Sequence, residues 1–547
     1  VSSFSLTFQK SLTFGVHIMI GLFILINGIA VSITKSWNSD HIIALVLGNL
    51  LLVAAYFYFI GIFRLSKKLF APKNEMEIID ESVSKIESKS FLLTDLSVKK
   101  YYQISFWAVA LVTFILPFLF MIHVPDSKLA WDYFVIFNST TELHGQSFGL
   151  LPETASRLGY FLRYPNNQFL GILFNQIFSP FAENVLLRMW VVTAVSALLT
   201  SLGVLAGTLS VKALSGKRHA ILYNVCALGF LPFYVYGAQL YSDTITLPFV
   251  SFGLLFFIYA IKSDKLNRQI LWYFLATLLT VLGYEFKPTV LIVLIAALVF
   301  LGLNKKWKQL LLLIPMFALL FVGGHFMVKA TIATEPAFSQ EANERHNLPM
   351  MHWIAMSWAP SNKTGGFNKK IRQYSESFPT YEAKKEADKQ LFIDNIKKMG
   401  PAGIVRQMGR KLSYTWLYGD LNSAFYTYYH ENKFINRYFD YLSGTSLTSL
   451  DGPGNITGWF MLKAVQTLYW IGLVVLLWRQ IWRILSRKKN WSNPWFVPAL
   501  AFVGLSFFLI LWETNSRYLY QFAPVMIALA SLGLIDNQFK KKKRVKE

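Results

Sequence analysis

Asp132 is the clearest candidate for chemistry in the chain, because it stands in the aromatic stretch KLAWDYFVIFN. The neighbouring Trp131, Phe134 and Val135 predict an interfacial helix that begins near this carboxylate. A carboxylate beside a low-dielectric surface is a good general base, because desolvation moves its pKa toward neutrality. An Asp at a helix N-terminus also stabilises the helix dipole, so a structural role is an equal alternative. Asp126 is a second candidate for the base.

A second polar stretch, RYPNNQ, follows in the same part of the chain. Its proline restricts the backbone, and its Arg and amide side chains offer donors suited to phosphate or sugar oxygens. We therefore expect a substrate-binding role for Arg163, Tyr164, Asn166 and Asn167. The alternative is that Asn167 caps a helix that begins at Gln168.

Two short turns carry further charges. Asp243 in YSDT is a candidate second catalytic carboxylate, although a turn favours such residues in any case. Lys287 in YEFKP could reach a phosphate, or it could pair with Glu285. Asp132 and Asp243 together could hold a divalent cation through hard oxygen ligands, but no spacing supports that site, so metal dependence stays open.

The remaining candidates lie later in the chain. His352 precedes Trp353, and a single His is more often structural than catalytic. Arg517 and Tyr518 belong to ETNSRY, where an Arg can form two parallel hydrogen bonds to a phosphate. The alternative is that both residues anchor a span at the membrane interface. The chain has no usable Walker loop, GxSxG, HExxH or dinucleotide-binding pattern, so we expect no nucleotide cofactor.

The composition identifies the setting of these residues. Of the 547 residues, 54% are hydrophobic and only 15% are charged, which is typical of an all-α polytopic membrane protein. The formal net charge of +23 comes from short basic clusters between apolar runs, so it indicates membrane topology rather than nucleic-acid binding. The single cysteine, Cys226, lies in an apolar run and is interpreted as a small packed side chain. No cleaved signal peptide is expected after Val1.

Apolar stretches of roughly 17 to 25 residues predict about twelve transmembrane helices. The predicted spans are 12–34, 41–63, 103–123, 185–211, 219–238, 245–261, 269–284, 287–303, 309–330, 456–479, 495–512 and 518–536.

Lys and Arg are concentrated in alternate connections, which by the positive-inside rule are cytoplasmic. Both termini are therefore predicted to be cytoplasmic, in a multi-pass protein of the cell membrane. The connections predicted to face outward are 35–40, 124–184, 239–244, 285–286, 331–455 and 513–517. All the candidate residues lie in or beside these connections, so the active site is expected on the outer face.

Two of the outward connections are long enough to hold structure of their own. Connection 331–455 predicts an amphipathic helix from Tyr381 to about Met399, which Gly400 and Pro401 end, and a second helix from about Ala402 to Trp416. The second helix carries Arg406, Arg410 and Lys411, and such basic helices commonly lie at the membrane interface.

The chain divides on this basis into four parts. These are an N-terminal transmembrane hairpin with a cytoplasmic segment (1–102), a transmembrane core (103–330) that includes the external loop 124–184, an external subdomain (331–455), and C-terminal helices with a basic tail (456–547).

The order of the motifs WDYFVIFNSTTEL, YPNNQ, YSDT, FKP and ETNSRY along this topology resembles the polytopic glycosyltransferases of the GT-C superfamily. The resemblance extends from about Gln103 to the C-terminus. It is strongest to the branch with protein O-mannosyltransferases, the lipid A aminoarabinose transferase and cell-wall glycosyltransferases of Gram-positive bacteria. In the first external loop Asp132 is followed by Tyr133, so the adjacent Asp-Glu pair of the O-mannosyltransferases is missing there, which makes a protein acceptor less expected.

The resemblance implies a polyprenyl-phosphate-linked sugar as donor and an extracytoplasmic glycan, lipid or protein as acceptor. It implies that Asp132 is the base, that Asp243 is the second acidic residue, and that cations hold the carrier phosphate, namely Arg163, Lys287 and Arg517. The reaction would invert the anomeric carbon. The sugar, the acceptor and the oligomeric state are not predicted.

Two other classes of protein remain as alternatives. A polysaccharide polymerase or ligase would use diphosphate-linked glycans and would depend on paired external arginines more than on Asp132. A flippase or transporter would carry charges near the middle of its spans, and those regions are almost free of charge in this sequence.

Overall fold

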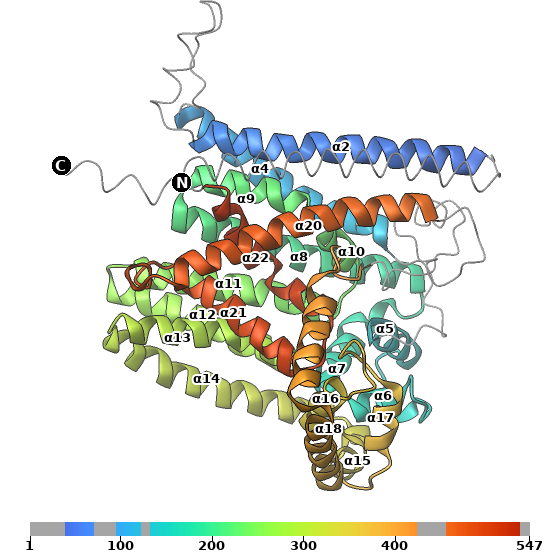
Figure 1. The fold of residues 1–547 in the computed structure, drawn as a ribbon. Helices are drawn as coiled ribbons and strands as arrows, with labels where there is room; N and C mark the ends of the chain where they lie inside the picture. The colour runs from blue at the N-terminus through green and yellow to red at the C-terminus, as the bar shows by residue number, and fades with distance from the viewer. Residues whose placement is uncertain (1–38, 71–94, 122–131, 424–455, 536–547) are drawn as a thin grey trace, which may run out of the picture.

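The computed structural model describes residues 39–70, 95–121, 132–423 and 456–535, and within these ranges every regular element is a helix. The long apolar helices lie side by side, and shorter helices gather at one end of them (Figure 1). The predicted all-α class is confirmed for this part of the chain. The predicted span 12–34 and Asp126 lie outside the described residues.

Six helices in the described ranges are long and apolar enough to cross a membrane. They are α4 (Asp95–Ile115, continued by η1, Leu116–Phe120), α8 (Val185–Ser215), α11 (Ser242–Lys262), α12 (Leu266–Phe286), α14 (Trp307–Ala333) and α20 (Ile456–Leu485). A seventh span results if α9 (Lys217–Leu228) is joined to α10 (Pro232–Val235) and η5 (Tyr236–Ala238) across a 68° bend. The predicted count of about twelve is therefore not confirmed.

Three other predicted spans correspond to helices that do not meet this length and composition test. They are η6 with α13 (Pro288–Val290 and Leu291–Leu303), α21 (Phe496–Leu511), and η11 with α22 (Ser516–Phe522 and Ala523–Gly533). The predicted span 41–63 lies within the 32-residue helix α2 (Ser39–Phe70). Proline stands in the first turn of η6 and of α22. It fits there because the first helical turn does not need the N–H donor that proline lacks.

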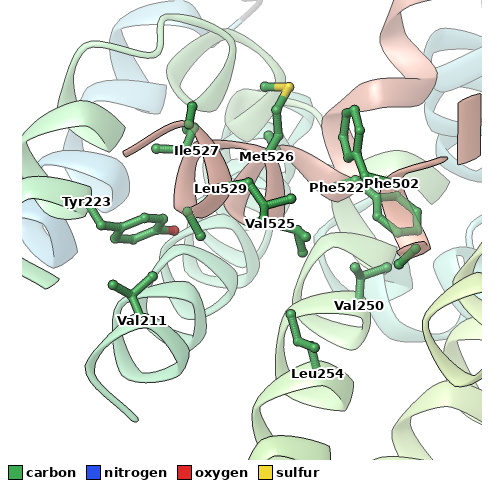
Figure 2. Packing of buried hydrophobic residues seen from close by; sticks show 14 of the residues in the cluster. Val211, Tyr223, Val250, Leu254, Phe502, Phe522, Val525, Met526, Ile527 and Leu529 are labelled. Carbon is green, nitrogen blue, oxygen red and sulfur yellow. The ribbon is translucent and has the colours of Figure 1, made fainter. Parts of the chain in front are cut away.

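Helix α22 is the centre of the membrane core. Every residue from Ala523 to Gly533 is buried, and the helix contacts α8, α9, α11, α20 and α21. Figure 2 shows Val525, Met526 and Leu529 of α22 among side chains of those neighbours. A helix that is apolar on all sides is stable only when it is enclosed in this way or faces lipid.

Helix α14, in contrast to α22, is almost entirely unburied. Only 6% of its most apolar 18-residue stretch is buried, and Leu311, Leu319 and Phe326 are among its exposed side chains. So large an exposed apolar face fits contact with lipid chains rather than water. This helix is therefore at the periphery of the membrane core.

The segment 132–184 folds into short helices beside the membrane core. They are α5 (Asp132–Leu143), η2 (Phe148–Leu150), α6 (Leu158–Arg163), η3 (Pro165–Asn167), α7 (Gln168–Phe178) and η4 (Ser179–Phe181). Phe134, Phe161 and Phe174 are among the side chains of a separate apolar cluster in this region. The same cluster includes Met189, Leu240 and Phe338, so the segment is packed together with neighbouring elements.

The second long segment adds η7 (Pro336–Phe338), α15 (Gln340–His346), α16 (Met350–Ser357), α17 (Lys369–Glu376) and α18 (Tyr381–Trp416). It packs against the first segment, since Leu348 N donates to Arg163 O at 3.1 Å and Gln168 Nε2 donates to Asn343 Oδ1 at 2.7 Å. The two segments predicted to face outward therefore form one body (Figure 1).

The predicted break near Gly400 is confirmed. Helix α18 has a non-helical residue there, with φ 59° and ψ −179°, and Pro401 follows. The positive φ favours glycine, which has no Cβ. The second half differs from a simple basic surface helix, because Lys411 is buried and donates to Ser357 Oγ at 2.8 Å and to Trp512 O at 2.7 Å. That half of α18 is bound to α16 and to the loop after α21.

Candidate active site

A cavity of about 2250 Å³ lies where the outward connections meet. Its wall includes residues of five predicted external connections, among them Asp132, Tyr241, Phe286, Trp353 and Arg517. Within the described ranges, the basic connections around 212–218, 262–268, 305–308 and 479–489 contribute no residue to it. The segments that charge patterning assigns to one side of the membrane thus build a single cavity.

Asp132 is the first residue of α5 and lies on the cavity wall, with 32% of its side chain exposed. Tyr160 donates its hydroxyl proton to Oδ1 at 2.9 Å, and Arg517 Nη2 donates to Oδ2 at 3.2 Å. The carboxylate also stands at the positive end of the α5 dipole. The two hydrogen bonds fix the orientation of the carboxylate.

The hydrogen bond from Tyr160 extends to a third residue. Asn167 donates from Nδ2 to the Tyr160 oxygen at 2.7 Å, so the chain of donors runs from Asn167 through Tyr160 to Asp132. Helix α7 begins at Gln168 as predicted, but the Asn167 side chain makes no capping hydrogen bond. Tyr160 was not singled out in the sequence, since nothing in the spacing of Asp132 and Tyr160 indicates their contact.

Asp243, in the first turn of α11, pairs with both cations of this region. Lys287 bonds to its Oδ1, and Arg517 Nε lies 3.1 Å from its Oδ2. Its side chain is only 3% exposed and is not part of the cavity wall, whereas Lys287 and Arg517 are. The geometry gives Asp243 the role of holding two cations in position, and Lys287 does not pair with Glu285.

Local structure explains how the two cations reach this point. Lys287 ends α12 in an extended conformation because Pro288 disfavours a helical residue before it. Asn515 accepts a bond from Arg517 N at 3.0 Å through its side chain and so starts η11. Lys287 Nζ lies 4.3 Å from the centre of the Tyr518 ring, and the Arg517 guanidinium lies 5.0 Å from that of Tyr241. Aromatic faces thus support both cations.

Glu513 is a carboxyl group of the cavity to which the sequence analysis gave no role. It is buried, and it accepts a hydrogen bond from the Tyr518 hydroxyl at 2.9 Å. Burial raises the pKa of Glu513 to about 7, with the hydrogen bond from Tyr518 acting in the opposite direction. A carboxylate directly after an apolar helix was the available signal.

Arg163 is on the cavity wall but apart from the inner group of Asp132, Asp243, Lys287 and Arg517. Its Nε lies 3.3 Å from Glu376 Oε1, on α17. Tyr164 and Asn166 also line the cavity, and the Tyr164 ring lies 5.5 Å from that of Trp353.

His352, like Asp243, is a predicted site residue that does not line the cavity. It is fully buried, and its Nδ1 lies 2.7 Å from Ser375 Oγ, which in turn donates to Asp388 at 2.6 Å. Burial lowers the pKa of His352 to about 4, with a smaller contribution from Arg372. These contacts describe a neutral histidine that joins α16 to α17.

The arrangement does not fit a divalent cation between Asp132 and Asp243. The Arg517 guanidinium forms ion pairs with both carboxylates, through Nη2 to Asp132 at 3.2 Å and through Nε to Asp243 at 3.1 Å. Within the part of the chain that the structure describes, no three His, Cys, Asp or Glu side chains are grouped closely enough to hold a metal. The oxygen-rich ligand set that such a cation needs is not formed here.

The fold and the cavity define an integral membrane protein whose polar site lies at one end of its apolar helices. The chain belongs to the CHIM_prot family, described as conserved hypothetical integral membrane protein, whose model matches residues 77–537. No curated protein matches the chain.

The chain is similar to two solved structures that bear on the GT-C resemblance. One is the oligosaccharyltransferase AglB of Archaeoglobus fulgidus in complex with an inhibitory peptide and a dolichol-phosphate, at 14% identity and a TM-score of 0.39, covering 80% of this chain and 50% of that one. The other is ArnT of Cupriavidus metallidurans bound to undecaprenyl phosphate, at 12% identity and a TM-score of 0.31, covering 79% and 77%.

The chain spans about half the length of the archaeal enzyme that it matches. Because both TM-scores are below 0.5, the likeness carries no argument about activity. The functional conclusion therefore rests on the cavity and its residues.

Proposed function

We propose that the protein is a membrane glycosyltransferase that moves a sugar from a polyprenyl-phosphate carrier to an extracytoplasmic acceptor. The observation that carries the proposal is the meeting of a part-exposed carboxylate, Asp132, with two cavity-lining cations, Lys287 and Arg517. A base beside a phosphate-binding pair is what transfer from a phosphate leaving group requires.

Lys287 and Arg517 hold the carrier phosphate in this mechanism. Both are cations fixed by Asp243 and by aromatic rings, so they need little reorganisation when negative charge grows on the leaving phosphate. Arg517 can offer a planar fork and Lys287 a point charge. Arg163, which pairs with Glu376 instead, is not needed for this step.

Asp132 accepts the proton of the acceptor hydroxyl. The acceptor oxygen forms a bond to the anomeric carbon, the bond from that carbon to the phosphate oxygen breaks, and the phosphate leaves with the electron pair. Attack from the face opposite the phosphate inverts the anomeric carbon. Such base catalysis typically contributes about 10²–10⁴-fold to the rate.

The proposal is tested with the purified protein in lipid nanodiscs and a panel of synthetic polyprenyl-phosphate sugars. Consumption of at least one monophosphate-linked sugar, with release of polyprenyl phosphate, is the expected result. A matched panel of diphosphate-linked glycans separates the polymerase or ligase alternative. Turnover of those donors alone would show that the proposed donor class is wrong.

A further inference from the structure

A second group of cations lies on the wall of the same cavity, apart from Lys287 and Arg517. Arg163 ends α6 and Arg372 lies in α17, and both guanidinium groups approach one carboxylate. Glu376 Oε1 lies 3.3 Å from Arg163 Nε, and its Oε2 lies 3.5 Å from Arg372 Nε. Two cations therefore share a single negative charge.

The surrounding charges leave this group cationic. Lys384 of α18 is buried and donates to the Arg345 carbonyl. The negative charge of Glu376 also interacts with the Lys384 ammonium group. Asp388 is a buried carboxyl of α18 that accepts a hydrogen bond from Ser375 on α17, and burial raises the pKa of Asp388 to about 6. Its negative charge is thus reduced in mildly acidic solution.

Other carboxylates at the cavity are already occupied. Glu382 pairs with Lys385 and is largely exposed, and Glu344 accepts a bond from Gln340. Ion pairs between exposed side chains contribute little and are screened by water. Arg163 and Arg372 line the cavity with side chains that are only 11% and 16% exposed, and Arg163 also donates from Nη2 to the Ala155 carbonyl. A guanidinium has five N–H donors, so each arginine has more donors than these contacts use.

An aromatic wall joins the two cationic groups. The Arg163 guanidinium lies 5.5 Å from the centre of the Tyr164 ring, which in turn lies 5.1 Å from that of Tyr160. Tyr160 bonds to Asp132, and the Trp353 ring lies 5.5 Å from that of Tyr164. Aromatic faces of this kind suit the apolar face of a sugar ring.

We propose that Arg163 and Arg372 bind a phosphate or carboxylate group of the acceptor, which makes the acceptor an anionic glycan or glycolipid. The inference rests on the proposed glycosyl transfer and adds the class of acceptor. The anionic group occupies the arginine pair, the neighbouring sugar lies along Tyr164 and Trp353, and the accepting hydroxyl reaches Asp132. Paired guanidinium groups are the usual partners of such anions.

The binding test uses three soluble probes with the purified full chain in detergent. They are methyl glucoside 6-phosphate, methyl glucuronide and neutral methyl glucoside, and binding is measured by calorimetry. The phosphate probe, the carboxylate probe or both should bind more tightly than the neutral one, and the difference should shrink as salt is raised. Which charged probe binds tells phosphate-bearing from carboxylate-bearing acceptors. Equal binding of all three probes contradicts the proposal.

Variants then locate the site. The double variant R163Q/R372Q should weaken binding of the charged probe by about tenfold or more, as expected for loss of charge-assisted hydrogen bonds. Arg157→Gln is the matched control, because Arg157 pairs with Glu142 and is not part of the cavity wall. Glu376→Gln should act in the opposite direction and tighten binding, since it frees both guanidinium groups from their shared carboxylate.

Undecaprenyl phosphate binding separates this inference from the proposed function. The double variant should bind undecaprenyl phosphate as the parent protein does, which also shows that it is folded. Unchanged affinity of the folded double variant for the charged probe overturns the anion site. Failure of the parent protein to bind undecaprenyl phosphate overturns the proposed function while leaving the probe measurements interpretable.

Discussion

Arg517 Nη2 lies 3.2 Å from Oδ2 of Asp132, although the two residues are 385 positions apart in the chain. The contact brings the turn after α21 to the start of α5 and fixes the candidate base beside a candidate phosphate ligand. The first predictions concern this contact.

Replacing Asp132 with Asn should abolish transfer while carrier binding is kept. The amide cannot accept the hydroxyl proton, so the rate should fall by about 10²–10⁴-fold. Turnover of the donor and binding of undecaprenyl phosphate are measured on the same preparation. Glu142→Gln on α5 is the control, because Glu142 is half exposed and pairs with Arg157. Full activity of the Asn variant removes Asp132 from the mechanism.

Replacing Tyr160 with Phe should lower kcat more than it changes KM. The variant removes one hydrogen bond to Asp132 and leaves the Asn167 amide without its acceptor, a loss of about 1–2 kcal/mol or about tenfold in rate. Undecaprenyl phosphate binding should stay as in the parent protein, because Tyr160 bonds to the candidate base and not to Lys287 or Arg517. Tyr101→Phe, at an exposed position of α4, serves as the control. An unchanged kcat contradicts the positioning role.

Replacing Asp243 with Asn should destabilise the protein and weaken carrier binding together. The variant leaves Lys287 and Arg517 close together without their shared carboxylate, and removal of one partner of a buried pair costs about 3–5 kcal/mol. Thermal unfolding in detergent gives the stability, and undecaprenyl phosphate binding gives the second readout. The double variant D243N/K287M should recover part of the loss. Parent-like stability of D243N means that the ion pairs contribute little.

The buried carboxyl of Glu513 predicts a pH-dependent stability. Its pKa of about 7 in the fold lies above the ordinary value of 4.5, so the folded chain binds more protons than the unfolded chain between these pH values. The stabilisation present below pH 4.5 should therefore be lost as pH rises toward 7, by about 3 kcal/mol at most. The melting temperature of Glu513→Gln should vary less over this window, and parallel profiles would exclude Glu513 as the cause.

Replacing Gly365 with Ala should destabilise the packing of Gly365 against Thr514 in the loop after α21. Gly365 has φ 74°, and an added Cβ would lie 2.7 Å from Lys411 Cγ and 3.0 Å from Thr514 Oγ1. The left-handed conformation alone costs a residue with a Cβ about 1–2 kcal/mol. Gly409→Ala on α18 is the control, since no atom lies within 4 Å of its added Cβ. Equal melting temperatures for the two variants would argue against this strain.

The sequence alone predicted the helical class, the break near Gly400 and the segments that surround the cavity. Hydropathy and charge are properties of neighbouring residues, and they predict which segments are apolar and which connections share a side of the membrane. Asp132, Lys287 and Arg517 could be singled out for the same reason, because charges beside apolar runs are costly and rare.

Only the tertiary structure decided which of these residues meet. Packing of distant helices pairs Arg517 with two carboxylates, buries Asp243 behind the cavity wall, pairs Arg163 with Glu376 and encloses His352 beside Ser375. Tyr160 and Glu513 gain their importance only from these contacts. A side chain's role depends on partners brought together by long-range packing, and local sequence carries no information about such partners.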